Sequence, residues 1–272
     1  MKSITFGQYY PADSLLHRMD PRMKVVLALL YIVFSFICTN VLSFALLLLS
    51  SVFLILISRI PPRLVFSGIK PILFIMLFTT LINVFLTGGE QLLLEVGPVR
   101  IYAEGLYRAA FMVIRIVVLI LATGMFLTYT TTPIMLTDAL ERLLAPLRLI
   151  GVPVHEFAMM MTIALRFIPT LMEETEKIMA AQKARGADFS SGSILSRVKA
   201  LIPILIPLVV SAFRRADELA TAMECRCYHG SSGRTRMKVL RYRASDFMAL
   251  FIIVLFGAAL VALNRLGIGY SM

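Results

Sequence analysis

The sequence predicts an all-α integral membrane protein with about five transmembrane helices and a cytoplasmic coupling domain of long amphipathic helices. Of its 272 residues, 59% are hydrophobic, and the mean hydropathy of +0.85 is too high for a domain with a fully wet surface. Leu, Ile, Val, Phe and Met occur in blocks of about 15 to 20 residues, the length that crosses a hydrocarbon core. The middle of the chain is instead rich in charge and has helical periodicity.

Charge and cysteine content agree with this class. The formal net charge of +11 is explained by the excess of Lys and Arg that membrane proteins keep on their cytoplasmic side, so nucleic-acid binding is not required. The three cysteines suggest reduced thiols in a cytosolic setting rather than a disulfide framework. The sequence has no short apolar stretch followed by a small-residue cleavage site, so we expect no removable signal peptide.

The apolar blocks divide the chain into segments. The first block is too long for one crossing and short for two, and we divide it near Thr39–Asn40. The blocks are 25–57, 72–86, 106–128 and 247–263. Five crossings result. We expect a membrane domain of four crossings over 1–128, a coupling domain over 129–245 and a last transmembrane helix within 246–272.

The loops between these blocks alternate in charge. The N-terminal lead-in, residues 9–24, and the segment after the second crossing are basic. The Thr39–Asn40 turn is uncharged, and the loop 87–105 contains three acids and one arginine. The positive-inside rule then predicts a multi-pass membrane protein whose N-terminus and coupling domain are cytoplasmic. The C-terminus is predicted outside.

Three helices are expected in the coupling domain. Thr132–Pro133 begins the first, Pro153 begins the second, which runs to about Ala184, and the third runs from about Leu195 to Arg226 with internal prolines. The two long helices begin apolar and end amphipathic. Their predicted packing stripes are Ile168, Leu171, Met172, Thr175, Met179 and Gln182, and then Leu205, Leu208, Val209, Ala212, Ala216, Leu219 and Met223.

The ends of these two helices resemble one another. A shift of 41 residues overlays 177–189 on 218–230 and places Arg226 on Arg185. Each arginine is framed by small or thin side chains, Ala184 and Gly186 in one case and Cys225 and Cys227 in the other. A cation at a helix C-terminus is often only an electrostatic cap, and Gly186 suits a C-cap. Two matched ends favour a second interpretation, in which each planar guanidinium enters a narrow groove on a partner.

Other motifs have weaker functional meaning. Cys225, Cys227 and His229 have the pattern Cys-x-Cys-x-His, but structural zinc usually needs a second pair of ligands, so no metal or cofactor is expected. The sequence contains no phosphate-binding loop and no clustered hydrolase residues, so we expect a non-catalytic subunit. Arg115 lies deep in an apolar block and predicts an interior partner, whereas Arg108 can reach outward.

The lead-in and the helix ends together resemble the transmembrane T component of energy-coupling-factor (ECF) transporters, over essentially the whole chain. The residues that carry this resemblance in the lead-in are Pro11, Asp13, Ser14, His17, Arg18, Asp20, Pro21, Arg22 and Lys24. Those in the second long helix are the run Leu165 to Glu174, which includes Arg166, Glu173 and Glu174. The family's Ala-Arg-Gly signature occurs in two copies. The first copy is intact at Ala184–Arg185–Gly186. The second copy follows Glu224 and departs from the signature, reading Cys225–Arg226–Cys227.

The resemblance implies a location in a prokaryotic plasma membrane, partners and a function. It implies that each arginine docks on one of two cytosolic ABC ATPases, which bind and hydrolyse the ATP. It also implies that their motion passes through the long helices to a small membrane S component that binds a vitamin or metal ion. Two alternatives stay open from the residues alone: an ordinary ABC-type permease with its own substrate path, and a membrane-embedded enzyme.

Overall fold

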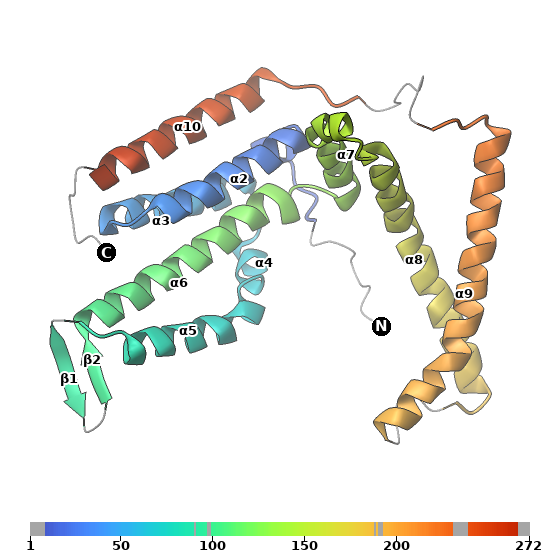
Figure 1. The fold of residues 1–272 in the computed structure, drawn as a ribbon, viewed down its shortest axis with the longest axis horizontal. Coiled ribbons are helices and arrows are strands. Elements are labelled where there is room, and N and C mark those ends of the chain that lie inside the picture. Colours follow the sequence, from blue (N-terminus) through green and yellow to red (C-terminus); the bar gives the residue numbers. More distant parts are fainter. Residues whose placement is uncertain are drawn as a thin grey trace. The chain divides into compact units, whose positions relative to one another are not determined.

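The computed structural model describes residues 9–89, 91–96, 99–187, 189, 193–230 and 239–265. These residues are almost entirely helical, which confirms the predicted all-α class (Figure 1). The chain forms two compact units, one of residues 1–139 with 238–272 and the other of residues 140–237.

The first unit contains most of the apolar helices. Its helices are α1 (Leu15–Arg18), α2 (Pro21–Ile37), α3 (Val41–Ser58), α4 (Pro62–Ser67), α5 (Leu73–Leu86), α6 (Ala103–Thr123) and α10 (Ala244–Arg265). Helix α6 continues through a π-helical turn, Gly124–Thr128, and α7 (Pro133–Leu143) follows it into the second unit.

Among the residues that the structure describes, four helical segments are long and apolar enough to cross a membrane. They are Val41–Ser58, Pro62–Leu86, Ala103–Thr128 and Ala244–Arg265. The predicted break within the first apolar block, 25–57, is present, because α2 ends at Ile37 and α3 begins at Val41. Helix α2 was predicted as the first of five crossings, but it is not one of these four segments. Its 17 residues, among them Arg22 and Lys24, span about 26 Å, less than the roughly 30 Å core.

Polar contacts at the helix ends fix the directions of the helices. The backbone N–H of Asp20 donates to Asp246 Oδ1 at 3.2 Å, so α2 and α10 begin at the same end. Lys24 Nζ donates to the Thr130 carbonyl at 2.9 Å, which places the end of α6 there too. At the opposite end, the Asn264 amide donates to the Ile37 carbonyl, so α2 and α10 run in parallel.

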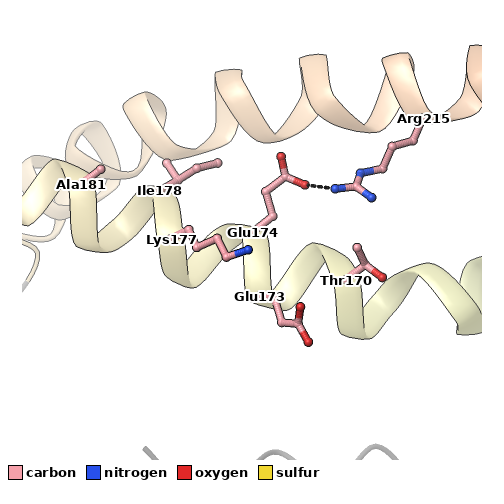
Figure 2. Close-up of a pocket in the computed structure, with 7 residues that line it drawn as sticks. All are labelled: Thr170, Glu173, Glu174, Lys177, Ile178, Ala181 and Arg215. Atoms are coloured by element: carbon pink, nitrogen blue, oxygen red, sulfur yellow. Dashed lines mark hydrogen bonds and ion pairs between the residues drawn. The ribbon is translucent and has the colours of Figure 1, made fainter.

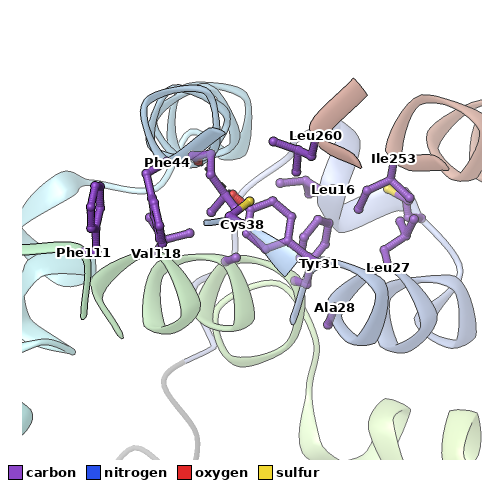
Figure 3. Packing of buried hydrophobic residues seen from close by; sticks show 14 residues of the cluster. Leu16, Leu27, Ala28, Tyr31, Cys38, Phe44, Phe111, Val118, Ile253 and Leu260 are labelled. Carbon is purple, nitrogen blue, oxygen red and sulfur yellow. Dashed lines mark hydrogen bonds between the residues drawn. The ribbon is translucent and has the colours of Figure 1, made fainter. Parts of the chain in front are cut away.

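A buried apolar cluster holds these helices together (Figure 3). The rings of Phe44 on α3 and Phe111 on α6 stack with centroids 4.9 Å apart. Tyr31 on α2 stacks on Phe256 of α10, with centroids at 6.3 Å and planes at 7°. Such aromatic contacts add to the burial of apolar surface, and α2 packs against both α6 and α10.

The loop before α6 contains a β-hairpin that was not predicted from the sequence. Strands β1 (Leu92–Val96) and β2 (Val99–Tyr102) pair antiparallel, with Glu95 opposite Arg100. Both strands are rich in β-branched or bulky apolar residues, which favour strand formation. The charge of this loop, on which its predicted location rested, carries no information about strand pairing.

The second unit contains the two long helices, with bounds close to those predicted. Helix α8 spans Val154–Ala184, and α9 spans Ile194–Cys225, and both continue through their internal prolines. Every predicted stripe residue of α8 is half-buried. On α9 the predicted stripe is partly wrong, because Leu205, Val209 and Ala216 are exposed, whereas Ser211 and Arg215 are half-buried. A polar contact, described below, sets the face that α9 presents.

Candidate functional site

The end of α8 is a Schellman motif. The Ala187 N–H donates to the Gln182 carbonyl and the Gly186 N–H to the Lys183 carbonyl, both at 3.0 Å. Gly186 has φ +84°, the left-handed conformation that this motif needs and that glycine adopts without strain. Arg185 is the last residue before that glycine, at the C-cap of the helix.

The end of α9 has the same geometry. The Tyr228 N–H donates to the Met223 carbonyl at 3.1 Å and the Cys227 N–H to the Glu224 carbonyl at 2.8 Å. Cys227 has φ +55°, so it occupies the left-handed position that Gly186 takes in α8. Arg226 therefore lies at the same place in its helix end as Arg185. Replacing glycine with cysteine in the second signature changes the side chain and keeps the backbone.

The six residues of the two helix ends are all exposed within this chain. They are Ala184, Arg185, Gly186, Cys225, Arg226 and Cys227. A guanidinium on a short, well-ordered helix end, with small neighbours on both sides, can enter a groove and donate several directional hydrogen bonds. We call the two segments 184–186 and 225–227 the arginine tips.

An ion pair joins α8 and α9 at matched positions (Figure 2). Arg215 Nη2 donates to Glu174 Oε2 at 2.7 Å. The two residues are 41 positions apart, the same shift that overlays the arginine tips. Glu174 precedes Arg185 by 11 residues (185 − 174), and Arg215 precedes Arg226 by 11 (226 − 215). Each tip therefore lies about 16 Å along its own helix from the ion pair.

The two helices run in opposite directions at this contact. A second contact, from Tyr228 Oη to Met159 Sδ at 3.1 Å, pairs the end of α9 with the first half of α8. The arginine tips consequently lie on opposite sides of the ion pair. Their separation along the helix axes is at most about 33 Å, because each arm contributes about 16 Å.

The surroundings of the ion pair are polar. Hydrogen bonding to Ser211, and then to Arg215, lowers the pKa of the Glu174 carboxyl below its ordinary value. The side chains of Arg215 and Glu174 are 35% and 25% exposed, so solvent weakens their attraction. A hollow of about 400 Å³ beside them is also lined by Glu173 and Lys177 (Figure 2).

The lead-in motif forms internal pairs in the first unit. Arg18 binds Asp13 through two hydrogen bonds, at 2.7 and 2.6 Å, and this contact lowers the pKa of Asp13. His17 Nε2 lies 2.9 Å from the Tyr10 carbonyl, which can only accept, so Nε2 carries the proton and Nδ1 accepts from the Ser14 hydroxyl at 2.7 Å.

The second half of the motif begins α2. Asp20 is the N-cap, and its carboxylate accepts from the Arg22 backbone at 2.9 Å and from the Arg22 guanidinium at 3.1 and 2.9 Å. Arg22 also lies over the Tyr242 ring at 3.9 Å, just before α10. These contacts explain the acids and the histidine that a basic lead-in alone leaves unexplained. The motif holds the N-terminal segment against the helix ends.

The remaining predicted site residues are spread along the long helices. Arg166 and Glu173 are exposed on α8, and the Glu224 carbonyl accepts the Cys227 N–H within the second tip. The structure does not bring the lead-in pairs and the arginine tips together in one unit.

The predicted interior partner of Arg115 can now be named. Its Nη2 donates to the Cys38 carbonyl at 2.9 Å, where α2 ends, and its guanidinium lies over the Phe44 ring at 5.2 Å. Arg108 is exposed, as expected. The Cys38 carbonyl has no partner within α2 because the helix ends there. Nothing in the sequence indicates that an arginine 77 positions away donates to it.

Known proteins resemble this chain along nearly its whole length. The family model described as cobalt transport protein (CbiQ) matches residues 12–238. A relative from Ruminiclostridium cellulolyticum is 54% identical over 256 residues, which are 94% of this chain and 95% of the relative. One from Bacillus subtilis is 46% identical over 264 residues, 97% of this chain and 98% of the relative. Both are named energy-coupling factor transporter transmembrane protein EcfT.

Proposed function

This chain belongs to the cobalt transport protein (CbiQ) family, and we propose that it is the transmembrane T component of an ECF-type importer, coupling two cytosolic ABC ATPases to a membrane S component. The family and the relatives' names support a membrane transport subunit. The ATPases, the S component and the docking residues belong to the proposal.

The arginine tips carry this proposal. They share one backbone motif, they are exposed, and each lies 11 residues beyond the Glu174–Arg215 pair. An arginine that served only as a cap would not require the same distance from a shared contact in both helices. Two equal arms with identical ends suit two similar partner subunits, one docked at each arginine. ATP-driven closure of the ATPases would then move both helices about their contact.

Exposed apolar surface supports contact with a membrane partner. The first half of α9 has exposed Leu201, Ile202, Leu205, Ile206, Val209, Val210 and Phe213. Helix α5 has no residue buried within the chain. Surfaces of this kind lie against lipid or another protein. We place the S component against these apolar surfaces. Choice of the vitamin or metal ion would then belong to that subunit.

The orientation follows from charge. Arg22, Lys24, Arg59, Arg63, Arg241 and Arg243 all lie near the end where α2 and α10 begin and α3 ends. The positive-inside rule places that end in the cytoplasm, with Gly88 and the end of α10 outside. A cysteine introduced at Gly88 in a background without native cysteines should react with a probe that cannot cross the membrane. Failure of the probe to label a cysteine at position 88 from outside would contradict this orientation.

Substitution of the two arginines tests the docking. If each guanidinium is buried in a partner groove, Arg185→Ala and Arg226→Ala should each weaken ATPase binding by about 2–5 kcal/mol. Lysine should restore little, because an ammonium cannot reproduce a bidentate planar contact. The double alanine variant should lose both ATPases, since linked contacts contribute together. Pull-down and vesicle uptake provide the measurements.

The cap interpretation predicts a different result. It expects a stability change below about 1 kcal/mol and lysine nearly as good as arginine. Arg214→Ala, at an exposed arginine of α9 outside the arginine tips and the predicted site residues, is the matched control. Full ATPase retention in the double alanine variant would remove the docking proposal. The purified chain should show no ATP hydrolysis until the ATPases are added, as expected of a non-catalytic subunit without its own cofactor.

A further inference from the structure

The first unit contains a second feature that the docking proposal does not use. An apolar groove of about 470 Å³ opens between α1, α2, α3 and α10. Met248, Ile252 and Phe256 line it from α10, and Leu49 and Phe53 line it from α3. Leu16, Leu27, Tyr31 and Ile253, which also line it, are seen in Figure 3.

The hydroxyl groups of Tyr31 and Ser50, which line the middle of this groove, are already hydrogen-bonded within the protein. Tyr31 Oη donates to the Leu47 carbonyl at 3.0 Å and lies 2.7 Å from Ser50 Oγ. Ser50 Oγ itself donates to the Leu47 carbonyl at 2.7 Å. A ligand with a polar end directed into the groove would have to break these bonds. The groove therefore suits a hydrocarbon chain.

The length of the groove matches one leaflet of a membrane. Its lining extends from Ser245 to Phe256 on α10 and from Leu46 to Ile57 on α3. Each stretch spans 11 residue steps (256 − 245 and 57 − 46), or about 16 Å. The hydrocarbon core of a bilayer is about 30 Å thick, so this is roughly half of it. An acyl chain has this reach, whereas a partner helix crossing the bilayer would need twice the length.

The mouth of the groove is basic. Arg241 and Arg243 are exposed immediately before α10, whose Ser245 lines the groove. Arg18, on α1, is paired with Asp13 and so contributes little net charge. Two exposed guanidinium groups at the level where the apolar helix begins are placed to meet a lipid phosphate.

From these observations we infer that the groove binds one acyl chain of an anionic phospholipid, whose phosphate lies against Arg241 and Arg243. The site is independent of the arginine tips, so the two proposals can fail separately. The lipid comes from the leaflet at the end where α2 and α10 begin.

A fluorescence experiment can test this site because the protein contains no tryptophan. Phe53→Trp places a reporter in the groove, and Phe251→Trp places one on an exposed α10 residue that does not line it. The full-length chain would be reconstituted in nanodiscs with small fractions of phosphatidylglycerol or phosphatidylcholine that carry brominated acyl chains, which quench tryptophan. We expect the groove reporter to be quenched at a lower fraction of the anionic lipid, by roughly fivefold for each arginine. The control reporter should follow the lipid fraction without preference.

Substitutions separate the two parts of the site. Ala249→Phe should fill the groove and abolish the preferential quenching, whereas Ala258→Phe, an exposed position on the same helix, should leave it unchanged. Arg241→Gln with Arg243→Gln should remove the anionic preference, and Arg265→Gln, at the other end of α10, should not.

The charge variants alter only exposed residues, so they decide the matter even if Ala249→Phe does not fold. Equal quenching by both lipids in the Phe53→Trp protein would overturn the inference. So would an unchanged anionic preference in the double glutamine variant. Loss of a copurifying membrane protein in Ala249→Phe, with lipid quenching intact, would instead assign the groove to a partner helix.

Discussion

Glu174 and Arg215 occupy equivalent positions in α8 and α9, and their side chains meet at 2.7 Å. An ion pair between equivalent positions of an internal repeat gives the pair of helices an approximate twofold character. The shift that overlays the arginine tips also overlays this contact. The two halves of the repeat therefore contribute opposite charges to a common point.

A double-mutant cycle should detect this contact. Glu174→Gln and Arg215→Gln should be coupled, so that the double variant loses less free energy of unfolding than the two single variants added together. Denaturant unfolding of the second unit within the full chain, followed by a local probe, measures the coupling. Glu173→Gln combined with Arg215→Gln is the control and should be additive. A cycle that closes to zero within about 0.3 kcal/mol would show that the pair does not stabilise the helices.

The backbone of the second arginine tip predicts a stabilising substitution. Cys227 adopts φ +55°, where a side chain costs roughly 1 kcal/mol relative to glycine. Cys227→Gly should therefore protect the last amides of α9 from hydrogen exchange. Gly186→Ala, at φ +84°, should weaken the end of α8 by a similar amount. Unchanged exchange in both variants would contradict the assignment of matching Schellman ends.

Acid should loosen the lead-in segment. Burial lowers the pKa of His17 below 6.5, so the folded protein binds this proton less readily than the unfolded chain. The contribution of His17 to stability is therefore present above pH 6.5 and is lost as the pH falls below it. Protonation would also oblige Nδ1 to donate instead of accepting from Ser14. Thermal unfolding between pH 7.5 and 5.5 should show a smaller decrease for His17→Gln than for the unsubstituted chain.

Removal of the Arg115 contact should destabilise the membrane helices. Arg115→Met deletes a charged hydrogen bond to the Cys38 carbonyl, and such bonds contribute about 1.5–3 kcal/mol. The loss should appear as a lower unfolding temperature in detergent. Arg108→Met, at an exposed position on the same helix, should have little effect. Equal effects at the two positions would mean that Arg115 is not specifically bound.

Local signals predicted the helices well. Proline at the start of α2, α7 and α8 and the long apolar blocks predicted helix bounds to within about three residues of those observed. The matched arginines could also be predicted, because an internal repeat is found by comparing the sequence with itself.

The contacts between helices could not be predicted in this way. The apolar stripe of α9 predicted that Ala216 lies on the face packed against α8. In the structure Ala216 is exposed, and Arg215 faces α8 because it pairs with the Glu174 carboxylate. The Cys38 carbonyl that binds Arg115 and the polar pairs of the lead-in depend on which helix ends meet. Such meetings are set by the packing of the whole unit and have no local pattern.

Equal arms on opposite sides of a contact have a mechanical consequence. Forces of equal size and opposite direction, applied at Arg185 and Arg226, would produce a torque about Glu174 and Arg215 and no net displacement of that point. Two partners that approach one another symmetrically would thus turn both helices in the same sense about that point. A force at a single tip would instead drag the whole pair, so only simultaneous engagement of both ends would convert approach into rotation.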